Sequence, residues 1–141
     1  MFMRDISIIV SHMRIFAERS FKSLGLGFPE QAVIMYLMGN SASNQLQIAE
    51  HFGIDQGAIT KTINKLESKG LVTRKINQNN KREKIISLTP KAISLKDELN
   101  KTYQVWSKTV FKNISEKDQE ILEKTISKMT ENSIALLNKD N

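Results

Sequence analysis

Apolar residues recur at helical spacing toward both ends of the chain and alternate with polar residues only near the middle. The first run extends from Ile6 to Leu24 in the i, i+3, i+4, i+7 pattern of one long helix, which a glycine-leucine-glycine sequence is expected to end. A second helix is expected to begin at Pro29, because proline at the first helical position loses no hydrogen bond. A short polar loop then follows at residues 39–43.

Residues 44–71 predict two short amphipathic helices joined by a tight turn, which is a helix-turn-helix. Asn44 can cap the first helix in a capping box with Gln47. Gly53 is placed to end this helix in the left-handed conformation, and Ile54 is expected to pack back under the turn. The pattern therefore indicates both ends of the first helix of the motif.

Asp55 can cap the second helix of the motif, residues 56–69, whose buried side is marked by Ile59, Ile63 and Leu66. The opposite side carries amide, hydroxyl and cationic side chains with one glycine and no acidic residue: Gln56, Gly57, Thr60, Lys61, Asn64 and Lys65. Such side chains suit the base edges and phosphates of DNA when a helix lies in the major groove. A polar face on a short helix is more often simply solvated, so this face alone does not establish DNA binding.

Residues 71–76 and 84–88 alternate apolar and polar side chains and predict two β-strands. The segment between them, residues 77–83, has no apolar residue, so the pair predicts a β-hairpin with a basic tip at Lys81 and Arg82. A helix-turn-helix followed by such a hairpin is a winged helix. The wing flanks the recognition helix, so Lys81 and Arg82 are also expected to contact DNA.

Two helices are expected after the wing. The first begins at Pro90, with Thr89 as its cap, and runs to about Asn113. The second is capped by Ser115 with Asp118. The expected fold class is therefore mainly α (α+β): a winged helix-turn-helix with a two-stranded β-wing and long N- and C-terminal dimerisation helices.

The chain is expected to form one unit of residues 1–141. Within it, residues 29–90 form a DNA-binding lobe, and residues 1–28 with 91–141 form a helical dimerisation region. We expect a homodimer because the end helices exceed what a winged helix needs to cover its core, and because one recognition helix contacts too few base pairs for useful specificity. A monomer with a helical cap is the alternative.

The net charge of +6 is concentrated in the residues of the winged helix. Residues 44–90 carry a net charge of +4, whereas residues 1–43 and 91–141 carry +1 each. This clustering is typical of a surface that binds a polyanion, although an anionic membrane would attract it too.

Several classes of protein lack support in the sequence. The absence of cysteine excludes disulfides and thiolate chemistry, and two histidines far apart leave few ligands for a metal ion. Neither a glycine-rich phosphate loop nor a nucleophile motif is present, so neither an enzyme nor a cofactor is expected. No apolar run is long enough to span a bilayer and no signal peptide is visible, so we expect a cytoplasmic protein.

Two motifs resemble the MarR family of transcriptional regulators. The helix-turn-helix reads QIAEHF, GIDQG, Thr60-Lys61 and LESKGLV, which is similar to the family's ELA-like helix, small turn, TR-containing recognition helix and L-x-x-x-G-L-V exit. In the wing, Asn80-Lys81-Arg82 precedes a strand that ends in Leu88-Thr89. Lys61 stands where the family usually has arginine, which keeps the charge but loses a bidentate contact. Asn80 stands where the family usually has aspartate, so the ion pair that would brace the wing arginine is missing or reduced to a hydrogen bond.

The resemblance implies a homodimeric, sequence-specific DNA-binding regulator, expected to be a repressor, that binds a pseudo-palindromic operator. It also implies release by a small, often aromatic or anionic, effector bound near His12, Met13 and Phe16. Those residues fit plain core packing as well, and both histidines fit structural roles. The alternative function is a winged-helix protein-interaction module without specific DNA binding. Because Asn80 cannot brace Arg82 with a full charge, we expect the wing to be mobile without DNA.

Overall fold

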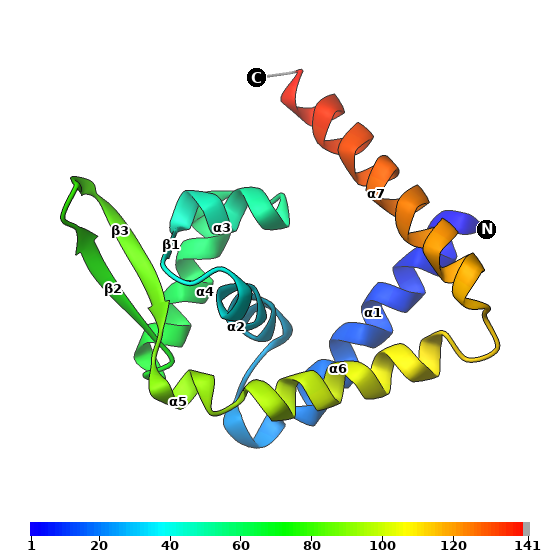
Figure 1. Ribbon diagram of the computed structural model, residues 1–141, viewed down its shortest axis with the longest axis horizontal. Coiled ribbons are helices and arrows are strands. Elements are labelled where there is room, and N and C mark those ends of the chain that lie inside the picture. Colours follow the sequence, from blue (N-terminus) through cyan, green and yellow to red (C-terminus); the bar gives the residue numbers. More distant parts are fainter. Residues whose placement is uncertain (140–141) are drawn as a thin grey trace. The chain divides into compact units, whose positions relative to one another are not determined.

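The computed structural model describes residues 1–139, which form two compact units, residues 1–106 and the residues from Ser107 onward. The fold is mainly helical with a small antiparallel sheet (Figure 1). Its elements are α1 (Phe2–Ser20), the 3-10 helix η1 (Lys22–Leu24), α2 (Phe28–Gly39), β1 (Ser43–Asn44), α3 (Gln45–Phe52), α4 (Gln56–Ser68), β2 (Val72–Asn77), β3 (Asn80–Leu88), α5 (Pro90–Ile93), α6 (Lys96–Val110) and α7 (Glu116–Asn138).

The helix-turn-helix forms as α3 and α4, and its predicted caps are present. The Asn44 Oδ1 atom accepts from the backbone N–H of Gln47 at 2.7 Å, and Gln47 returns a bond to the Asn44 N–H at 2.9 Å. Gly53 takes a left-handed φ of 62°, and Asp55 accepts from the Ala58 N–H at 2.9 Å. The packing predicted for Ile54 is wrong: its N–H closes the turn, but 46% of the residue is exposed.

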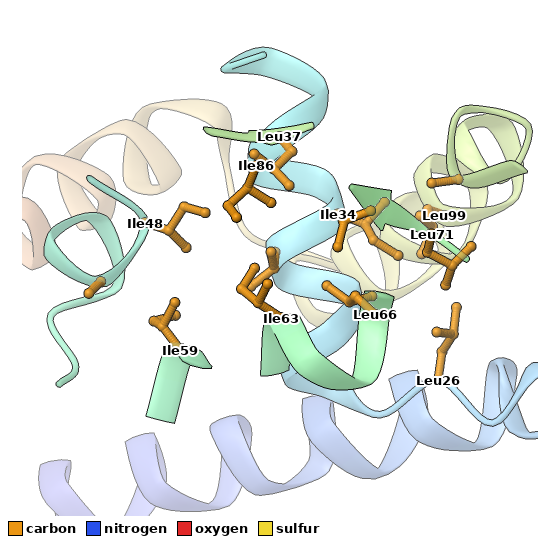
Figure 2. Packing of buried hydrophobic residues seen from close by; sticks show 14 of the residues in the cluster. Leu26, Ile34, Leu37, Ile48, Ile59, Ile63, Leu66, Leu71, Ile86 and Leu99 are labelled. Carbon is orange, nitrogen blue, oxygen red and sulfur yellow. The ribbon is translucent and has the colours of Figure 1, made fainter. Parts of the chain in front are cut away.

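The recognition helix α4 is held by its apolar side. Ile59, Ile63 and Leu66 are fully buried, as the spacing predicts. Figure 2 shows them in one cluster with apolar residues of the predicted lobe, Ile34, Leu37, Ile48, Leu71 and Ile86, and with Leu26 and Leu99, which lie outside residues 29–90. Because packing in such a core fixes side chains in single rotamers, the opposite side of α4 is presented in one fixed orientation.

Two buried polar side chains join α2 to its neighbours, and the sequence analysis did not identify either. The Gln31 Nε2 group donates to the carbonyl oxygens of Ala17 and Leu26 at 2.9 and 3.1 Å. The Glu30 carboxylate accepts from Lys69 Nζ at 2.5 Å, which ties α2 to the end of α4. Buried polar groups need such partners, so these contacts fix how the helices meet.

Two predicted helices are shorter than the pattern indicates. The first helix ends at Ser20, and the chain turns through η1 before Gly25 takes a left-handed φ of 61°. The helix predicted to run from Pro90 to about Asn113 is divided into α5 and α6. At the break, the Ser94 hydroxyl donates to the Lys91 carbonyl oxygen at 2.6 Å, competing with the helical bonding there. The apolar spacing continues across this break, so the sequence pattern predicted one continuous helix.

The sheet has the order β1-β3-β2, so the predicted hairpin is present and the short strand β1 extends it. β1 pairs with β3 through Ser43 with Ile86 and Asn44 with Ile85, in a segment predicted as loop. β2 and β3 pair regularly from Val72 with Leu88 to Ile76 with Lys84. The next pair is Asn77 with Asn80, so residues 81–83 of β3 have no partner on β2. The wing therefore carries a bulge near its tip.

The final helix α7 begins as predicted: Ser115 accepts from the Asp118 N–H at 3.1 Å and donates to the Asp118 carboxylate at 2.7 Å. None of its 23 residues is buried. Among residues 1–139, no helix has the length and apolar content needed to cross a membrane.

Candidate nucleic-acid interface

The outer face of α4 gathers the polar residues predicted for it. Gln56, Gly57, Lys61, Asn64 and Lys65 are exposed, and Thr60 is half-buried. The helix cap also favours glycine at position 57, because a Cβ there would lie 3.0 Å from the capping Oδ1 atom of Asp55. The face is therefore cationic and rich in amides, as a groove-reading helix requires.

Two side chains of this face already have partners within the protein. The Thr60 hydroxyl donates to the Gln56 carbonyl oxygen at 2.8 Å and accepts from Gln45 Nε2 at 2.9 Å. Arg74 on β2 donates through Nη2 to Asn64 Oδ1. Asn64 can therefore offer its amide N–H groups to DNA while its oxygen is engaged.

Arg74 is a residue of this interface that the sequence analysis missed. It lies on β2, 18% exposed, and also approaches the Glu67 carboxylate at 3.9 Å. The sequence did contain a sign of this role. Arg74 is a charged residue between Val72 and Ile76, on the side of the strand that alternation assigns to the interior. Arg74 links the recognition helix to the wing.

The two predicted wing cations, Lys81 and Arg82, are exposed on the bulged segment of β3. The backbone N–H of Arg82 donates to Asn80 Oδ1 at 3.2 Å, so Asn80 shapes the turn rather than bracing the guanidinium. Within residues 1–139, no ion pair is made by Lys81 or Arg82, nor by Lys61 or Lys65 on α4. All four cations are therefore available to an external anion.

Glu83 is the second residue that the sequence analysis missed. Its carboxylate accepts from Asn77 Nδ2 at 2.6 Å and from Asn44 Nδ2. These bonds, from Asn77 first and Asn44 second, hold the pKa of Glu83 below its usual value, because they favour the charged form. The sequence could have indicated this role, because Glu83 is the single acidic residue of a basic hairpin and has asparagines nearby.

A polar groove of about 570 Å³ separates the wing from the start of α4. It is lined by Asn44, Gln45, Leu46, Gln56, Thr60, Asn80, Arg82, Glu83 and Lys84. The groove brings together Gln56 and Thr60 of the recognition helix and Arg82 of the wing. The other predicted residues lie outside its lining: Gly57, Lys61, Asn64, Lys65 and Lys81.

An apolar cavity of about 220 Å³ lies apart from this surface, between α1, α2 and α6. Met13 and Phe16, two of the three residues near which the resemblance implies an effector, line it, and the Phe16 ring lies 5.7 Å from that of Trp106. His12 lines a separate shallow depression, with Phe16 at the edge of both. His51 packs against Tyr36 at 4.4 Å between ring centroids, which agrees with a structural role. Within the described residues, no cluster of three potential metal ligands occurs.

Comparison with known proteins gives one family and a consistent fold. Residues 30–84 match the model of the MarR family. The fold matches that of the transcriptional regulator SlyA with a TM-score of 0.93 and 21% identity over 99% of each chain. A MarR-family transcriptional regulator from Listeria monocytogenes, solved with a 26mer DNA, matches at 0.91 and 24% over 99% of this chain and 95% of that one. The S. aureus MepR-DNA complex matches at 0.85 and 19% over 94% and 98%.

Proposed function

This chain carries a MarR-family winged-helix domain, and on that premise we propose that it is a sequence-specific, DNA-binding transcriptional regulator of the cytoplasm. The observation that carries the proposal is the outer face of α4, where exposed amides and cations stand beside a basic wing. Two structures of the same fold contain DNA, which supports this use of the fold. The proposed DNA contacts are Gln56, Gly57, Thr60, Lys61, Asn64, Lys65, Lys81 and Arg82.

A gel shift against the DNA upstream of the chain's own gene tests this proposal, with random duplex of equal length as the competitor. Specific binding supports a regulator, and repression follows if the bound site overlaps the promoter. Failure to bind any duplex more tightly than random DNA at moderate salt would favour the alternative, a winged-helix module that binds a protein partner instead.

We assign residues 29–90 to the DNA-binding lobe, and residues 1–28 with 91–141 to a dimerisation region, of which residues 140–141 lie outside the described part. The support is the exposed apolar surface of the end helices. On α7 the exposed apolar residues are Ile121, Leu122, Ile126, Met129, Ile134, Leu136 and Leu137, and on α1 they include Phe2, Met3, Ile8, Ile9, Val10 and Ile15. A helix with an apolar stripe is stable in water when that stripe is covered, and a second copy of the chain supplies the same stripe.

Sedimentation should therefore give a particle of twice the 16.1 kDa chain mass. Ile126→Lys, at the middle of the α7 stripe, should shift the equilibrium toward monomer because it places a charge in the buried interface. Glu131→Gln changes the net charge by the same amount on the polar side of α7, opposite the apolar stripe, and should leave the dimer intact. A parent protein that stays monomeric at micromolar concentration would refute the dimer.

Lys61→Ala and Asn64→Ala should each reduce discrimination between the operator and random DNA. A good contact to a base edge is worth about 1–3 kcal/mol of discrimination. Titration of both duplexes with each variant measures the effect, with thermal melting as the control for folding. Equal weakening on the two duplexes would assign these side chains to phosphates.

The apolar cavity supports release of DNA by a small-molecule effector. Its lining is Met13, Phe16, Ala17, Phe28, Gln31, Ala32, Met35, Leu99, Thr102, Tyr103 and Trp106, which includes no charged side chain. A volume of about 220 Å³ suits a ligand of about one ring. We therefore propose a neutral aromatic effector rather than an anionic one, because an anion would lose hydration there without a cationic partner.

A further inference from the structure

The two wing cations lie on a part of β3 that the sheet itself does not hold in place. The pairing passes from Ile76 with Lys84 directly to Asn77 with Asn80, so Lys81, Arg82 and Glu83 have no partners on β2. A bulge changes the direction of the side chains that it carries, and its extra residues lack the ladder hydrogen bonds that fix regular strands. Other contacts must therefore set the direction of Arg82.

The Glu83 carboxylate supplies such contacts, and both of its oxygen atoms are used. Oε2 accepts from Asn77 Nδ2 at 2.6 Å on the neighbouring strand, and Oε1 accepts from Asn44 Nδ2. Asn44 is itself fixed, because it caps α3 through Gln47 and pairs with Ile85 as part of β1. One carboxylate thus joins the bulge, the other strand of the wing and the start of the helix-turn-helix.

We propose that Glu83 is the positioning residue of the wing: its carboxylate clamps the bulge to Asn77 and Asn44 and so sets the direction in which Arg82 meets DNA. This inference rests on the proposed function, since it assigns Glu83 a part in DNA binding. It also replaces the expected brace at position 80, because the Asn80 side chain accepts from the backbone N–H of Arg82, whereas Glu83 provides a full negative charge.

The charge of Glu83 allows a sharp test. An acid on a surface that binds phosphates repels them, so a Glu83 without a positioning role would weaken binding, and Glu83→Gln would strengthen it. As a clamp, Glu83 has the opposite effect. Glutamine keeps the size of the side chain but presents an N–H group toward one of the two asparagine donors, so Glu83→Gln should loosen the bulge and weaken operator binding.

Two variants separate the clamp from the charge. Asn77→Ala removes one donor to Glu83 without changing the net charge, although it also removes the 3.0 Å bond from the Asn79 N–H to Asn77 Oδ1. Glu50→Gln removes one negative charge from an exposed position of α3 and leaves the wing contacts in place. Glu83→Gln and Asn77→Ala should behave alike, and Glu50→Gln should not.

The first measurement is hydrogen exchange of the wing amides in the protein without DNA. Loss of one hydrogen bond to a charged group should speed exchange of the Arg82 N–H, which is bonded to Asn80 Oδ1 at 3.2 Å, about tenfold in Glu83→Gln and Asn77→Ala, with the amides of α4 unchanged. Unchanged exchange in both variants would overturn the clamp, whatever their DNA binding. The exchange measurement does not involve DNA. It therefore still tests the clamp if the parent protein binds no operator and the proposed function is wrong.

The second measurement is operator titration of a double-mutant cycle with Arg82→Ala. Each clamp variant should bind about fivefold to tenfold more weakly than the parent, and Arg82→Ala should cost less in the Glu83→Gln background than in the parent, because residues that act together are not additive. Tighter binding by Glu83→Gln, matching Glu50→Gln, would show that Glu83 acts only by its charge. Full additivity with Arg82→Ala would show that Glu83 does not act through Arg82.

Discussion

Operator affinity should fall by about four orders of magnitude when the salt concentration rises from about 50 to about 200 mM. Lys61, Lys65, Lys81 and Arg82 are exposed and make no ion pair within residues 1–139. If both subunits of a dimer place these four cations on phosphates or in the grooves, about eight counterions are released, and the slope of log K against log salt is about −7. Fluorescence anisotropy of a labelled operator over a salt series measures the slope.

Single substitutions identify which cations contribute to the slope. Lys65→Ala removes one cation from each subunit and should make the slope shallower by about 2. Lys108→Ala removes an exposed cation of α6, outside the proposed lobe, and should leave the slope unchanged. A parent slope shallower than about −3 would mean that most of the four cations face solvent in the complex.

Ile63→Ala should lower the free energy of unfolding by about 2–5 kcal/mol. Ile63 is fully buried at the centre of the lobe, in the cluster that joins α4 to α2, α3 and the sheet (Figure 2). Removing its branched side chain loses transfer free energy and leaves a cavity that close-packed neighbours fill only in part. A domain of this kind has a total stability of about 5–15 kcal/mol, so DNA binding should fall with the folded fraction.

Urea unfolding measures this loss, with Lys61→Ala as the matched control. Lys61 lies two residues earlier on the exposed side of the same helix, so its removal should change stability by no more than about 0.5 kcal/mol. Its effect belongs to DNA binding instead. An Ile63→Ala protein as stable as Lys61→Ala would mean that the α4 stripe is not the core of the lobe.

The helix-turn-helix could be predicted from sequence because its determinants are local. Asn44 and Gln47 cap each other three residues apart, and Asp55 caps α4 by accepting from the Ala58 N–H, also three residues on. Apolar spacing then assigns Ile63 and its neighbours to the interior and leaves the cationic face outside. Caps and periodicity depend on residues within one or two helical turns, which are visible in the sequence.

The failures occurred where apolar spacing alone does not decide the structure. The helix after Pro90 keeps a continuous apolar pattern, yet the Ser94 hydroxyl takes the Lys91 carbonyl oxygen and the chain breaks there. Ile54 follows the glycine of a standard helix end, but it remains exposed. At Ser94 a hydrogen bond within one turn interrupts the helix although the apolar spacing continues, and at Ile54 the turn forms while the side chain stays exposed.

The sequence by itself determined both helices of the helix-turn-helix with their caps, the hairpin that follows them, and the face of α4 that carries Lys61 and Lys65. Only the tertiary structure decided which side chains of that surface are already engaged. Arg74 reaches Asn64 across ten positions, and Glu83 reaches Asn44 across 39. Partners so far apart meet only after the core has placed β1, β2, β3 and α4 together, because neither capping nor periodicity carries information about contacts between distant segments.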